Sequence, residues 1–598
     1  RAGYWSNGTL AVSASNSWAI DAGDPDSSAY TNEPPPHGNR LNLGVYGGTT
    51  NASRSDTNSP ALLAVSFRDG GTFSDGEPLY WAYRGILPTN TIRIDYSLDG
   101  GLTWATAVSQ IRVDSAPYVW YPPADATASP EAWWRVVLEG NTNVWDSNRT
   151  NFTFRPVPLR YYVNDDGPAD VDVYTTAFGS PTNRGYVSNS PLHSIQAVLD
   201  RYQLAGGDEI LVDTGVYTLS NSVIITLLNS GNTNEQAKIT GSTNWAAGGS
   251  RLQPSTGMAA PAFLLFGAHD VGISNFRLAG FHNGVSFSES AMRCALSDLD
   301  IQGSTGPGVL SSVATDIRLD RLLIREGSAA GLSAGSSKLS MESCVLWSNR
   351  NSAIVLTGSE IQMSNSVVAA SGPGQYCYQM GTNVFIVADY NDLYVTNGAE
   401  IATVSGMAYP KLPQWVLGTL QDRHSLSTDP LFHDPANGDF HLRSVAGRYA
   451  HGTGWTNDVS VTNLPDFSPL IDLGAPRSAW SNEPMTNGSR RNIGLYGNTA
   501  QASKSNPSQW LLAVTAMSGG IVEGGFHLTW GYGGGILSNA AVQLEYSRNN
   551  GKTWQRIDSN AVGACEFFWQ SDLKKSDGGE RWDTSPGARW RIFLLANT

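Results

Sequence analysis

The sequence between residues 271 and 369 repeats itself with a period of 22 or 23 residues. Written in rows, it gives VGISNFRL, CALSDLDI, IRLDRLLI, LSMESCVL and IQMSNSVV. A fixed period of this length, with apolar residues at the same places in each row, is typical of a solenoid in which one structural coil stacks on the next. The repeat therefore restricts the possible folds more than any other feature of the chain.

Inside each row, apolar and polar residues alternate, which is the pattern of a β-strand with one buried face. The alternation changes phase once per row, at the column that contains Asn275, Asp298 and Arg321, and we expect a sharp bend there between two short strands. A third strand recurs near Val285 and Val309, after turns rich in Gly, Ser and Asn. Three short parallel strands per coil predict a right-handed β-helix.

A second, longer repeat spans the whole chain. Residues 18–55 return as residues 469–505, and the turn SLDGGLTW at 97–104 returns as SRNNGKTW at 547–554. The offset predicts a unit of about 450 residues, of which this chain holds about one and a third. We therefore expect a much longer parent polypeptide, or a polymer, in which β-helix and small domain alternate.

The long repeat predicts four parts. Residues 1–57 are expected to close a preceding β-helix repeat, and residues 58–158 to form a β-sandwich of short strands separated by turns. Residues 159–500 are the expected β-helix, with an amphipathic cap helix at 194–203. Residues 501–598 repeat the sandwich without its last strand. The predicted fold class is all-β, a right-handed parallel β-helix of 22–23 residues per coil flanked by two immunoglobulin- or fibronectin-like sandwiches.

Composition excludes several partners. The formal net charge of −14 argues against nucleic acid and against anionic membrane surfaces. No apolar run approaches the roughly 20 residues that span a bilayer. Low charge and abundant aromatic, Asn and Thr residues suggest an extracellular or cell-surface protein. Of the four cysteines, Cys294 and Cys344 lie two coils apart, so we expect buried free thiols rather than a disulfide scaffold.

The run SIQAVLDRYQLAGGDEILVDTGVY at 194–217 resembles the opening of pectate-lyase-like right-handed β-helix proteins. DPLFHDPANGDFHLRS at 429–444 and SPLIDLGAP at 468–476 look like closing coils of secreted members of that superfamily. The resemblance covers roughly residues 160–500 and implies the fold. It does not select an activity, because the superfamily includes lyases, hydrolases, adhesins and phage tailspikes. The small domains are similar to fibronectin- or immunoglobulin-like modules of giant bacterial surface proteins.

One charged group interrupts the outward face of the first strands. Asp320 and Glu342 are expected on adjacent coils about 5 Å apart, beside Arg318. Close carboxylates can hold a cation or share a proton for acid/base catalysis, and Trp347 on the next strand could stack on sugars. We favour the simpler interpretation, a solvated Arg–carboxylate pairing, because the denser Asp sets of the pectin-cleaving enzymes in this superfamily are missing here. We assign no catalytic residue and keep these four side chains as candidate substrate contacts.

Two further motifs have mainly structural interpretations. An acidic cluster after residue 163 has the oxygen ligands that calcium prefers but no ligand-spacing rule, so a polar turn is favoured and calcium is the one cofactor considered. Its members are Asn164, Asp165, Asp166, Asp170 and Asp172. The turn at 97–104 matches an Asp box, in which Asp99 can bond the turn amides; Asn549 replaces it in the second copy, which suits a structural turn.

The favoured function is an extracellular structural or adhesive repeat module of a very long bacterial surface or matrix protein. Such a module would build a stiff fibre or sheath, and its expected partners are other copies, joined head to tail, and glycans. The alternative is a polysaccharide lyase or glycoside hydrolase acting in a groove around Arg318, Asp320 and Glu342.

Overall fold

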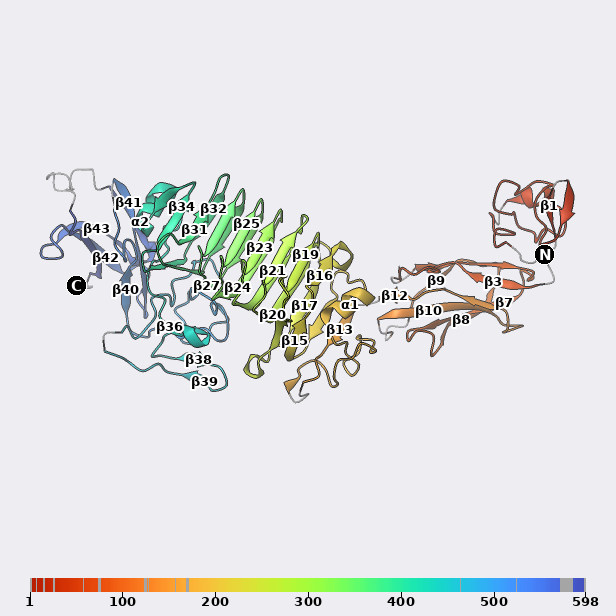
Figure 1. Cartoon of the computed structure of the whole chain (residues 1–598), viewed down its shortest axis with the longest axis horizontal. Coiled ribbons are helices and arrows are strands. Elements are labelled where there is room, and N and C mark those ends of the chain that lie inside the picture. The colour runs from red at the N-terminus through yellow and green to blue at the C-terminus, as the bar shows by residue number, and fades with distance from the viewer. Residues whose placement is uncertain are drawn as a thin grey trace. The chain divides into compact units, whose positions relative to one another are not determined.

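The computed structural model divides into two compact units, Arg1–Leu159 and Arg160–Thr598, and each is described by itself. The residues that it describes are 3–6, 8–13, 17–24, 27–56, 59–73, 77–122, 126, 128–155, 158–167, 171–462, 464–522, 524–570 and 585–595. The second unit contains the solenoid, which runs through the yellow and green part of the chain (Figure 1).

The solenoid is a parallel β-helix with three strands per coil. Its first strands are β13 (Arg160–Val163), β14 (Glu209–Val212), β17 (Ala237–Gly241), β20 (Val271–Ala279), β22 (Ala295–Gln302), β24 (Ile317–Arg325), β26 (Lys338–Glu342), β29 (Glu360–Ser364) and β32 (Phe385–Asp389). β20, β22 and β24 continue through the bend; the separate second strands are β15 (Gly215–Leu219), β18 (Ser250–Pro254), β27 (Val345–Trp347), β30 (Val367–Ser371) and β33 (Asp392–Thr396). Together they form one 14-stranded sheet.

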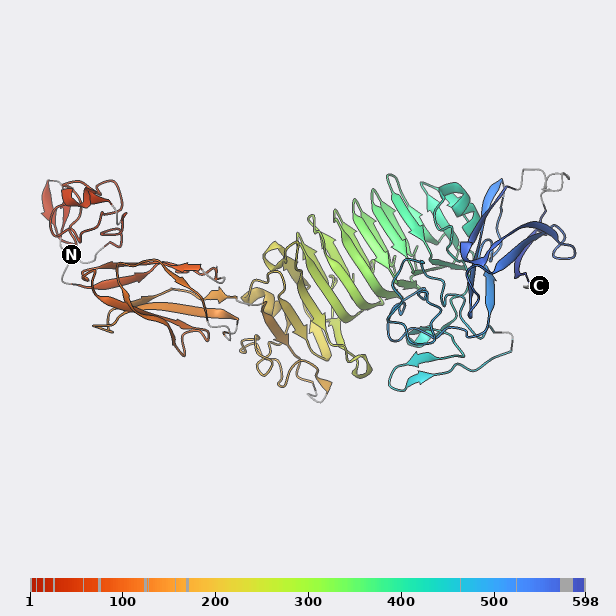
Figure 2. The same cartoon turned by 180° about the vertical axis from the view of Figure 1, so that it is seen from behind.

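The third strands form a second, nine-stranded sheet. They are β16 (Val223–Thr226), β19 (Phe263–Phe266), β21 (Val285–Ser288), β23 (Val309–Ser312), β25 (Leu332–Gly335), β28 (Ile354–Thr357), β31 (Tyr376–Met380) and β34 (Glu400–Val404), and β35 (Met407–Tyr409) pairs antiparallel with β34. The two sheets face each other along the stack of coils (Figure 2).

The strand register confirms the predicted coil. Leu296 pairs with Ile273 on one side and Leu319 on the other, so the apolar columns stack inside the solenoid. The bend column lies in the left-handed region, with φ of 62° at Asn275 and 51° at Arg321. A residue in the left-handed conformation bends the chain and interrupts the strand. The side chains that follow it therefore alternate in the opposite phase. The phase change in the sequence therefore marks the bend, as predicted.

Each end of the coil stack is covered. At the first coil, α1 (Ile195–Arg201) begins at Ser194, whose side chain accepts from the Ala197 N–H, and its apolar side chains Ile195, Val198 and Leu199 are buried. The predicted cap helix is confirmed. At the other end, β35 is followed by α2 (Leu412–Thr419), which buries Trp415. Among the described residues, α1 therefore packs on the first coil and α2 on the last, as expected for structures that cover the ends of a solenoid.

The segments that resemble closing coils do not add coils, and this prediction is wrong. β36 (Phe432–Asp434) and β37 (Asp439–Leu442) form an antiparallel hairpin, and β38 (Arg448–Ala450) and β39 (Gly454–Thr456) form another. The chain then returns along the outer side of the second strands as a segment without strands, residues 468–505, which we call the C-terminal clasp. The apolar runs in this region were typical of strands, but they bury themselves against the solenoid wall instead.

The clasp covers an apolar stripe on the outside of the solenoid. Leu323, Val345 and Val367 point outward from successive second strands, yet at most 4 % of each is exposed. They pack with Leu470, Ile471, Leu473 and Ile493 of the clasp. Burying large aliphatic side chains contributes roughly 1.5–3 kcal/mol each, so this layer is a substantial part of the second unit's core.

The clasp has its own internal frame. Asn492 Oδ1 accepts from the Asp472 N–H at 2.9 Å, and its Nδ2 donates to Ser503 O at 2.8 Å. Glu483 Oε1 accepts from the backbone N–H groups of Asn492 and Asn498 at 2.9 and 2.8 Å. These buried polar side chains replace the hydrogen bonds that strands would otherwise supply.

The remaining strands form the two small domains. In the first unit β3 (Ala61–Ala64) pairs with β6 (Trp81–Arg84), β5 (Glu77–Leu79) pairs with β9 (Tyr118–Trp120), and a larger sheet holds β4 (Thr72–Phe73), β12 (Phe152–Phe154), β10 (Ser129–Leu138), β7 (Thr91–Ser97), β8 (Ala105–Arg112) and β11 (Trp145–Ser147). They enclose one core around Trp81, Trp120 and Trp134. Ahead of them, β1 (Tyr4–Ser6) and β2 (Thr9–Ala11) form a short hairpin.

The second small domain belongs to the second unit. Its sheets are β40 (Trp510–Ala513), β41 (Gly525–Gly533) and β44 (Glu566–Gln570), and β43 (Gln555–Ala561), β42 (Ala541–Ser547) and β45 (Arg589–Leu594). Both domains are all-β, and their likeness to immunoglobulin or fibronectin modules stays a prediction. So do the four domain boundaries taken from the sequence repeat.

The Asp box is a structural hairpin in both copies. Asp99 accepts from the Thr103 N–H at 2.9 Å and from Ser97 Oγ at 2.7 Å. Burial acts to raise the pKa of Asp99, but these hydrogen bonds outweigh it and lower the pKa to about 2. Asn549 accepts from the Thr553 N–H at 2.8 Å in the same way.

The four cysteines are free, and Cys294, Cys344 and Cys377 are buried, as predicted for thiols that act as small apolar side chains. Within the described part of the chain, no helix has the length and apolar character needed to cross a membrane.

Candidate functional site

Asp320 and Glu342 lie side by side on neighbouring coils, as the repeat predicts. β24 pairs in parallel with β26, and the register places Asp320 next to Glu342. Both side chains leave the outer face of the sheet, because Leu319, between Arg318 and Asp320, is buried in the core. The candidate residues of the first strands therefore share one surface.

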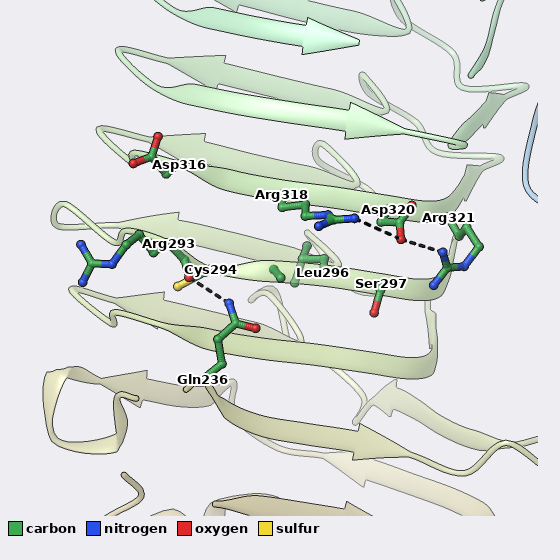
Figure 3. A pocket seen from close by; sticks show the side chains of 10 residues that line it. Gln236, Arg293, Cys294, Leu296, Ser297, Asp316, Arg318, Asp320 and Arg321 are labelled. Atoms are coloured by element: carbon green, nitrogen blue, oxygen red, sulfur yellow. Dashed lines mark hydrogen bonds and ion pairs between the residues drawn. The ribbon is translucent and has the colours of Figure 1, made fainter. Parts of the chain in front are cut away.

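The main partner of Asp320 is Arg321 rather than Arg318. Arg321 Nη1 donates to Asp320 Oδ2 at 2.6 Å, whereas Arg318 Nη2 lies 4.0 Å from the same oxygen (Figure 3). Arg321 also donates to both oxygens of Asp298, at 2.7 and 2.8 Å. Because Arg321 occupies the bend column, its guanidinium reaches the carboxylates of its own coil and of the preceding coil. The expected pairing is present, but Asp320 is only 8 % exposed and so is hardly solvated.

The environment of Asp320 leaves little room for proton transfer. Burial raises the pKa of this carboxyl group, and the nearby Arg321 and Arg318 act against that rise. Oδ2 is bonded to Arg321, while Oδ1 is covered and has no hydrogen-bond partner. A general acid or base needs an oxygen within reach of a substrate proton, and neither oxygen of Asp320 offers one in this arrangement.

Glu342 accepts hydrogen bonds from the clasp. Its Oε1 accepts from Arg491 Nη1 at 2.7 Å, from Asn365 Nδ2 at 3.1 Å and from Ser478 Oγ at 3.4 Å. Glycosidases use two carboxyl groups that flank the scissile bond, one as an acid and the other as a base or nucleophile. Asp320 and Glu342 are each paired with a separate arginine.

Two depressions flank Arg318 on this face. The first has a volume of about 390 Å³ and is bordered by Gln236, Arg293 and Asp316 (Figure 3). The second, of about 470 Å³, lies over the following coils. Arg293 is engaged with both oxygens of Asp270 at 2.8 and 2.7 Å. Arg318, with 64 % of its side chain exposed, borders both depressions and is the group best placed to meet an anionic ligand.

The outer face of the nine-stranded sheet carries no ionisable side chain along its central ladder. That ladder consists of Ile224, Leu264, Ser286, Leu310, Ser333, Val355, Gln379 and Thr403. Acid/base catalysis and cation binding both require titratable or charged groups. This ladder therefore offers no catalytic set.

Trp347 does not present an open ring. It stacks on Tyr394 with centroids 5.8 Å apart, and Phe432 and Phe440 meet it edge-on at 5.2 and 6.1 Å. The last two belong to the hairpin that follows the coils, and Trp347, Phe432 and Phe440 pack in the apolar layer under the clasp. The expectation of an outward sugar platform is corrected here, because a segment distant in sequence covers the position.

A third cavity, which we call the clasp pocket, lies between the second strands and the returning chain. It has a volume of about 660 Å³, within the usual size range of ligand sites. From the coils it is lined by Trp245, Arg277, Asp298 and Asp300, and from the returning chain by His433, Asp434, Asn437, Asp439, Arg448, His451, Tyr496 and Gln501. Sequence reasoning did not find it, because its walls come from segments more than a hundred residues apart.

A signal for this pocket was present in the sequence. The outward column of the second strands runs Arg251, Arg277, Asp300 and then Leu323, Val345, Val367. A wall that changes from charged to apolar at the fourth position predicts that something covers its apolar half. The pocket forms at the edge of that cover.

Comparisons with known proteins identify no family and no activity for this chain. No protein-family model matches the chain, and no curated protein matches it. Among solved structures, a pectate lyase, Pel9A, shares 16 % identity over 57 % of this chain and 96 % of its own, with a TM-score of 0.33. The catalytic unit of a thermostable GH87 α-1,3-glucanase from Streptomyces thermodiastaticus strain HF3-3 shares 10 % over 59 % and 86 %, with a TM-score of 0.17. The strand pairing of this chain shows the parallel β-helix by itself, and these likenesses identify neither a family nor an activity.

Three residues of the expected calcium cluster make hydrogen bonds within the chain. Asp165 accepts from the backbone N–H groups of Gly167 and Val216, and Asn164 Nδ2 donates to Asp172 at 2.8 Å. Asp170 lies outside the described residues. The described residues hold no group of three or more His, Cys, Asp or Glu side chains placed to bind a metal ion. Calcium at Asp165, Asp166, Asp170 and Asp172 stays a prediction.

Proposed function

We propose that this chain is a structural repeat module of a longer extracellular polypeptide, in which a clasp closes each β-helix along one side. The segment at residues 17–55, the N-terminal clasp, matches the C-terminal clasp in sequence and in internal bonding. Asn42 accepts from the Asp21 N–H at 2.8 Å and donates to Ser53 O at 2.7 Å, and Glu33 accepts from the N–H groups of Asn42 and Gly48. Each bond has its counterpart around Asn492 and Glu483.

One contrast carries the proposal. Ile493 of the C-terminal clasp is 1 % exposed against the solenoid, whereas its equivalent Leu43 is 58 % exposed and the next apolar residue, Val45, 85 %. A Cβ built on Gly494 meets Val367 at 3.6 Å, while one on the equivalent Gly44 meets nothing within 4 Å. The N-terminal clasp thus has the fold and the apolar face of the C-terminal clasp, but its apolar face is exposed. From the order of the parts in the chain, we expect this face to dock on the solenoid of a preceding repeat.

One substitution gives this docking its specificity. Arg491 pairs with Glu342 across the clasp interface, but its equivalent in the N-terminal clasp is Leu41. An unpaired carboxylate facing Leu41 would be costly. The preceding solenoid should therefore carry an apolar or neutral residue where this one carries Glu342, so that each clasp fits its own repeat.

The proposal is tested by adding the missing wall. In an extended chain, a second copy of residues 160–467 that carries Glu342→Leu is placed directly before Ser17. Hydroxyl-radical footprinting then compares this extended chain with the present chain. Tyr46, now 60 % exposed, should fall in reactivity to the level of Tyr496. In a matched chain whose added copy also carries Val345→Asp, the charged wall should leave Tyr46 reactive.

Two results would contradict this function. Equal Tyr46 reactivity in all three chains would show that the clasp does not dock. Head-to-tail association of the unextended chain in sedimentation experiments, with Tyr46 protected, would make a second copy the occupant instead of a preceding repeat.

The enzymatic alternative has less support. The carboxylates of Asp320 and Glu342 are each paired with an arginine, and the described ladder of the other sheet lacks ionisable groups. A cleavage assay on polysaccharides whose product disappears in Asp320→Ala would favour a lyase or hydrolase. Adhesion to glycans at an extracellular surface remains part of the proposal.

A further inference from the structure

The second small domain packs directly on the end of the solenoid. Val514 is 5 % exposed and belongs to the same apolar layer as Leu426, which follows the last coil. Thr529 is 1 % exposed, and its Oγ1 donates to Arg423 O at 3.4 Å. Glu566 Oε2 lies 3.8 Å from Arg423 Nη1. One outer face of this domain is therefore an interface with the end of the coil stack.

The first small domain has the same face, built by the same strand pairing. The Val65 N–H donates to Tyr80 O at 2.9 Å, as the Val514 N–H does to Thr529 O. The register between β5 and β9 also matches that between β41 and β44. Leu79, next to Tyr80, is buried in the core, so Tyr80 points outward. We call the exposed set Val65, Pro78, Tyr80 and Pro117 the Tyr80 face; its counterparts are Val514, His527, Thr529 and Glu566.

In the described residues of the first unit, nothing covers the Tyr80 face. Val65 and Tyr80 are each 47 % exposed, against 5 % and 1 % for their counterparts. A Cβ built on Gly520 would lie 2.8 Å from Pro413 of α2, whereas one on the equivalent Gly71 meets only a ring of its own domain. Exposed apolar side chains that adjoin on one face indicate an interaction surface.

The Tyr80 face is uncharged where its counterpart is charged. Glu566 Oε2 lies 3.8 Å from Arg423 Nη1 and 3.6 Å from His424 Nε2, and His527 Nδ1 is 3.0 Å from the same oxygen. Two prolines of the Tyr80 face stand at the positions of Glu566 and His527. An arginine covered by prolines would lose water without gaining a carboxylate. The partner of the Tyr80 face should therefore be neutral where this solenoid carries Arg423 and His424.

We infer that the Tyr80 face docks on the end of the preceding solenoid, which carries neutral side chains at the positions of Arg423 and His424. The inference rests on the proposed function, because the partner is the same preceding repeat, and it adds a second contact with its own chemistry. The clasp covers the side of that solenoid, and the small domain covers its end. Two contacts of this kind would join successive repeats as a stiff fibre.

Thiol labelling with iodoacetamide tests the inference. Val65→Cys places a thiol on the Tyr80 face, and Val514→Cys places one at the buried counterpart as a reference. The extended chain, whose added copy carries Glu342→Leu, receives Arg423→Leu and His424→Gln in that copy as well. Labelling at residue 65, followed by peptide mass spectrometry, should slow at least about tenfold from the present chain to the extended chain, because the face must open before the reagent reaches the thiol.

Two aspartate variants of the extended chain form a matched pair. Tyr80→Asp puts a charge inside the expected contact and should restore fast labelling at residue 65, while Tyr46 stays protected in footprinting. Tyr121 is 69 % exposed, and its equivalent Gln570 is exposed in the docked domain. Tyr121→Asp should therefore leave the labelling slow.

The reactivity of Tyr46 separates this inference from the proposed function. A protected Tyr46 with residue 65 labelled as fast as in the present chain would overturn the inference and leave the docking of the clasp intact. Slow labelling at residue 65 with a reactive Tyr46 would support the Tyr80 face and contradict the clasp. Equal effects of the two aspartate variants, or slow labelling in the chain without the added copy, would also overturn the inference.

Discussion

At the scale of the residue, Asp392 is a fully buried carboxyl group of the solenoid with a raised pKa. It lies on β33, is 0 % exposed, and accepts from the Thr428 N–H at 3.0 Å through one oxygen, while the other oxygen has no partner. Burial raises the pKa of Asp392 to about 8, so the folded chain holds its proton at pH 7. The unfolded chain releases that proton near pH 4.

The sign of the resulting pH dependence follows from these two pKa values. Below pH 4 both states are protonated and Asp392 contributes nothing. Between pH 4 and pH 8 only the unfolded state ionises, so the free energy of unfolding falls by up to about 1.4 kcal/mol per pH unit. Asp392→Asn cannot ionise and should match the unaltered chain at pH 4 but exceed it at pH 8 by several kcal/mol, measured by urea unfolding.

The control for this prediction is Asp316→Asn. Asp316 is exposed in a turn with a φ of 56°, a conformation that asparagine tolerates well. That variant should keep the pH profile of the unaltered chain. Parallel profiles for Asp392→Asn and the unaltered chain would show that Asp392 is ionised in the fold.

At the scale of the element, the clasp joins the solenoid through a charge pair above an apolar layer. Arg491→Leu, which copies Leu41 of the N-terminal clasp, removes the cation from Glu342 and should lower the free energy of unfolding by about 1–3 kcal/mol, since Glu342 is partly exposed. Adding Glu342→Leu should restore most of the loss, because two leucines extend the apolar layer. Urea unfolding of the four chains of this cycle measures the coupling.

A surface pair on the same coils serves as reference. Lys338 and Glu360 are 3.5 Å apart on β26 and β29, with about half and a third of their side chains exposed. Lys338→Leu should change the free energy of unfolding by less than about 1 kcal/mol. Equal losses for Lys338→Leu and Arg491→Leu would mean that the clasp pair has no special role.

The same elements show how far sequence reasoning reaches. The inward columns and the bend column could be predicted, because coil geometry depends on residues 22 or 23 positions apart and repeats many times. The clasp could not, because the pair Arg491–Glu342 spans 149 positions and occurs once. For the same reason Arg318 was expected to neutralise Asp320, whereas the left-handed conformation at Arg321 brings a nearer guanidinium. Trp347 was expected outside because the chain that covers it gives no local signal.

At the scale of the whole molecule, the two units have separate cores. The core of the first small domain draws on residues from Leu62 to Phe154, and the apolar columns of the solenoid lie entirely in the second unit. Two cores that share no buried side chains should unfold in separate thermal transitions. We expect calorimetry of the full chain to resolve at least two transitions.

Matched substitutions assign those transitions. Ile94 in β7 and Ile324 in β24 are buried to the same degree, 0 % and 2 % exposed, in different units. Ile→Ala in such a site costs about 2–5 kcal/mol, so each variant should lower one melting temperature by several degrees. Ile94→Ala should move only the transition of the first unit, and Ile324→Ala only one of the second. If both variants shift every transition together, the chain unfolds as one cooperative body and the repeat is not made of separable modules.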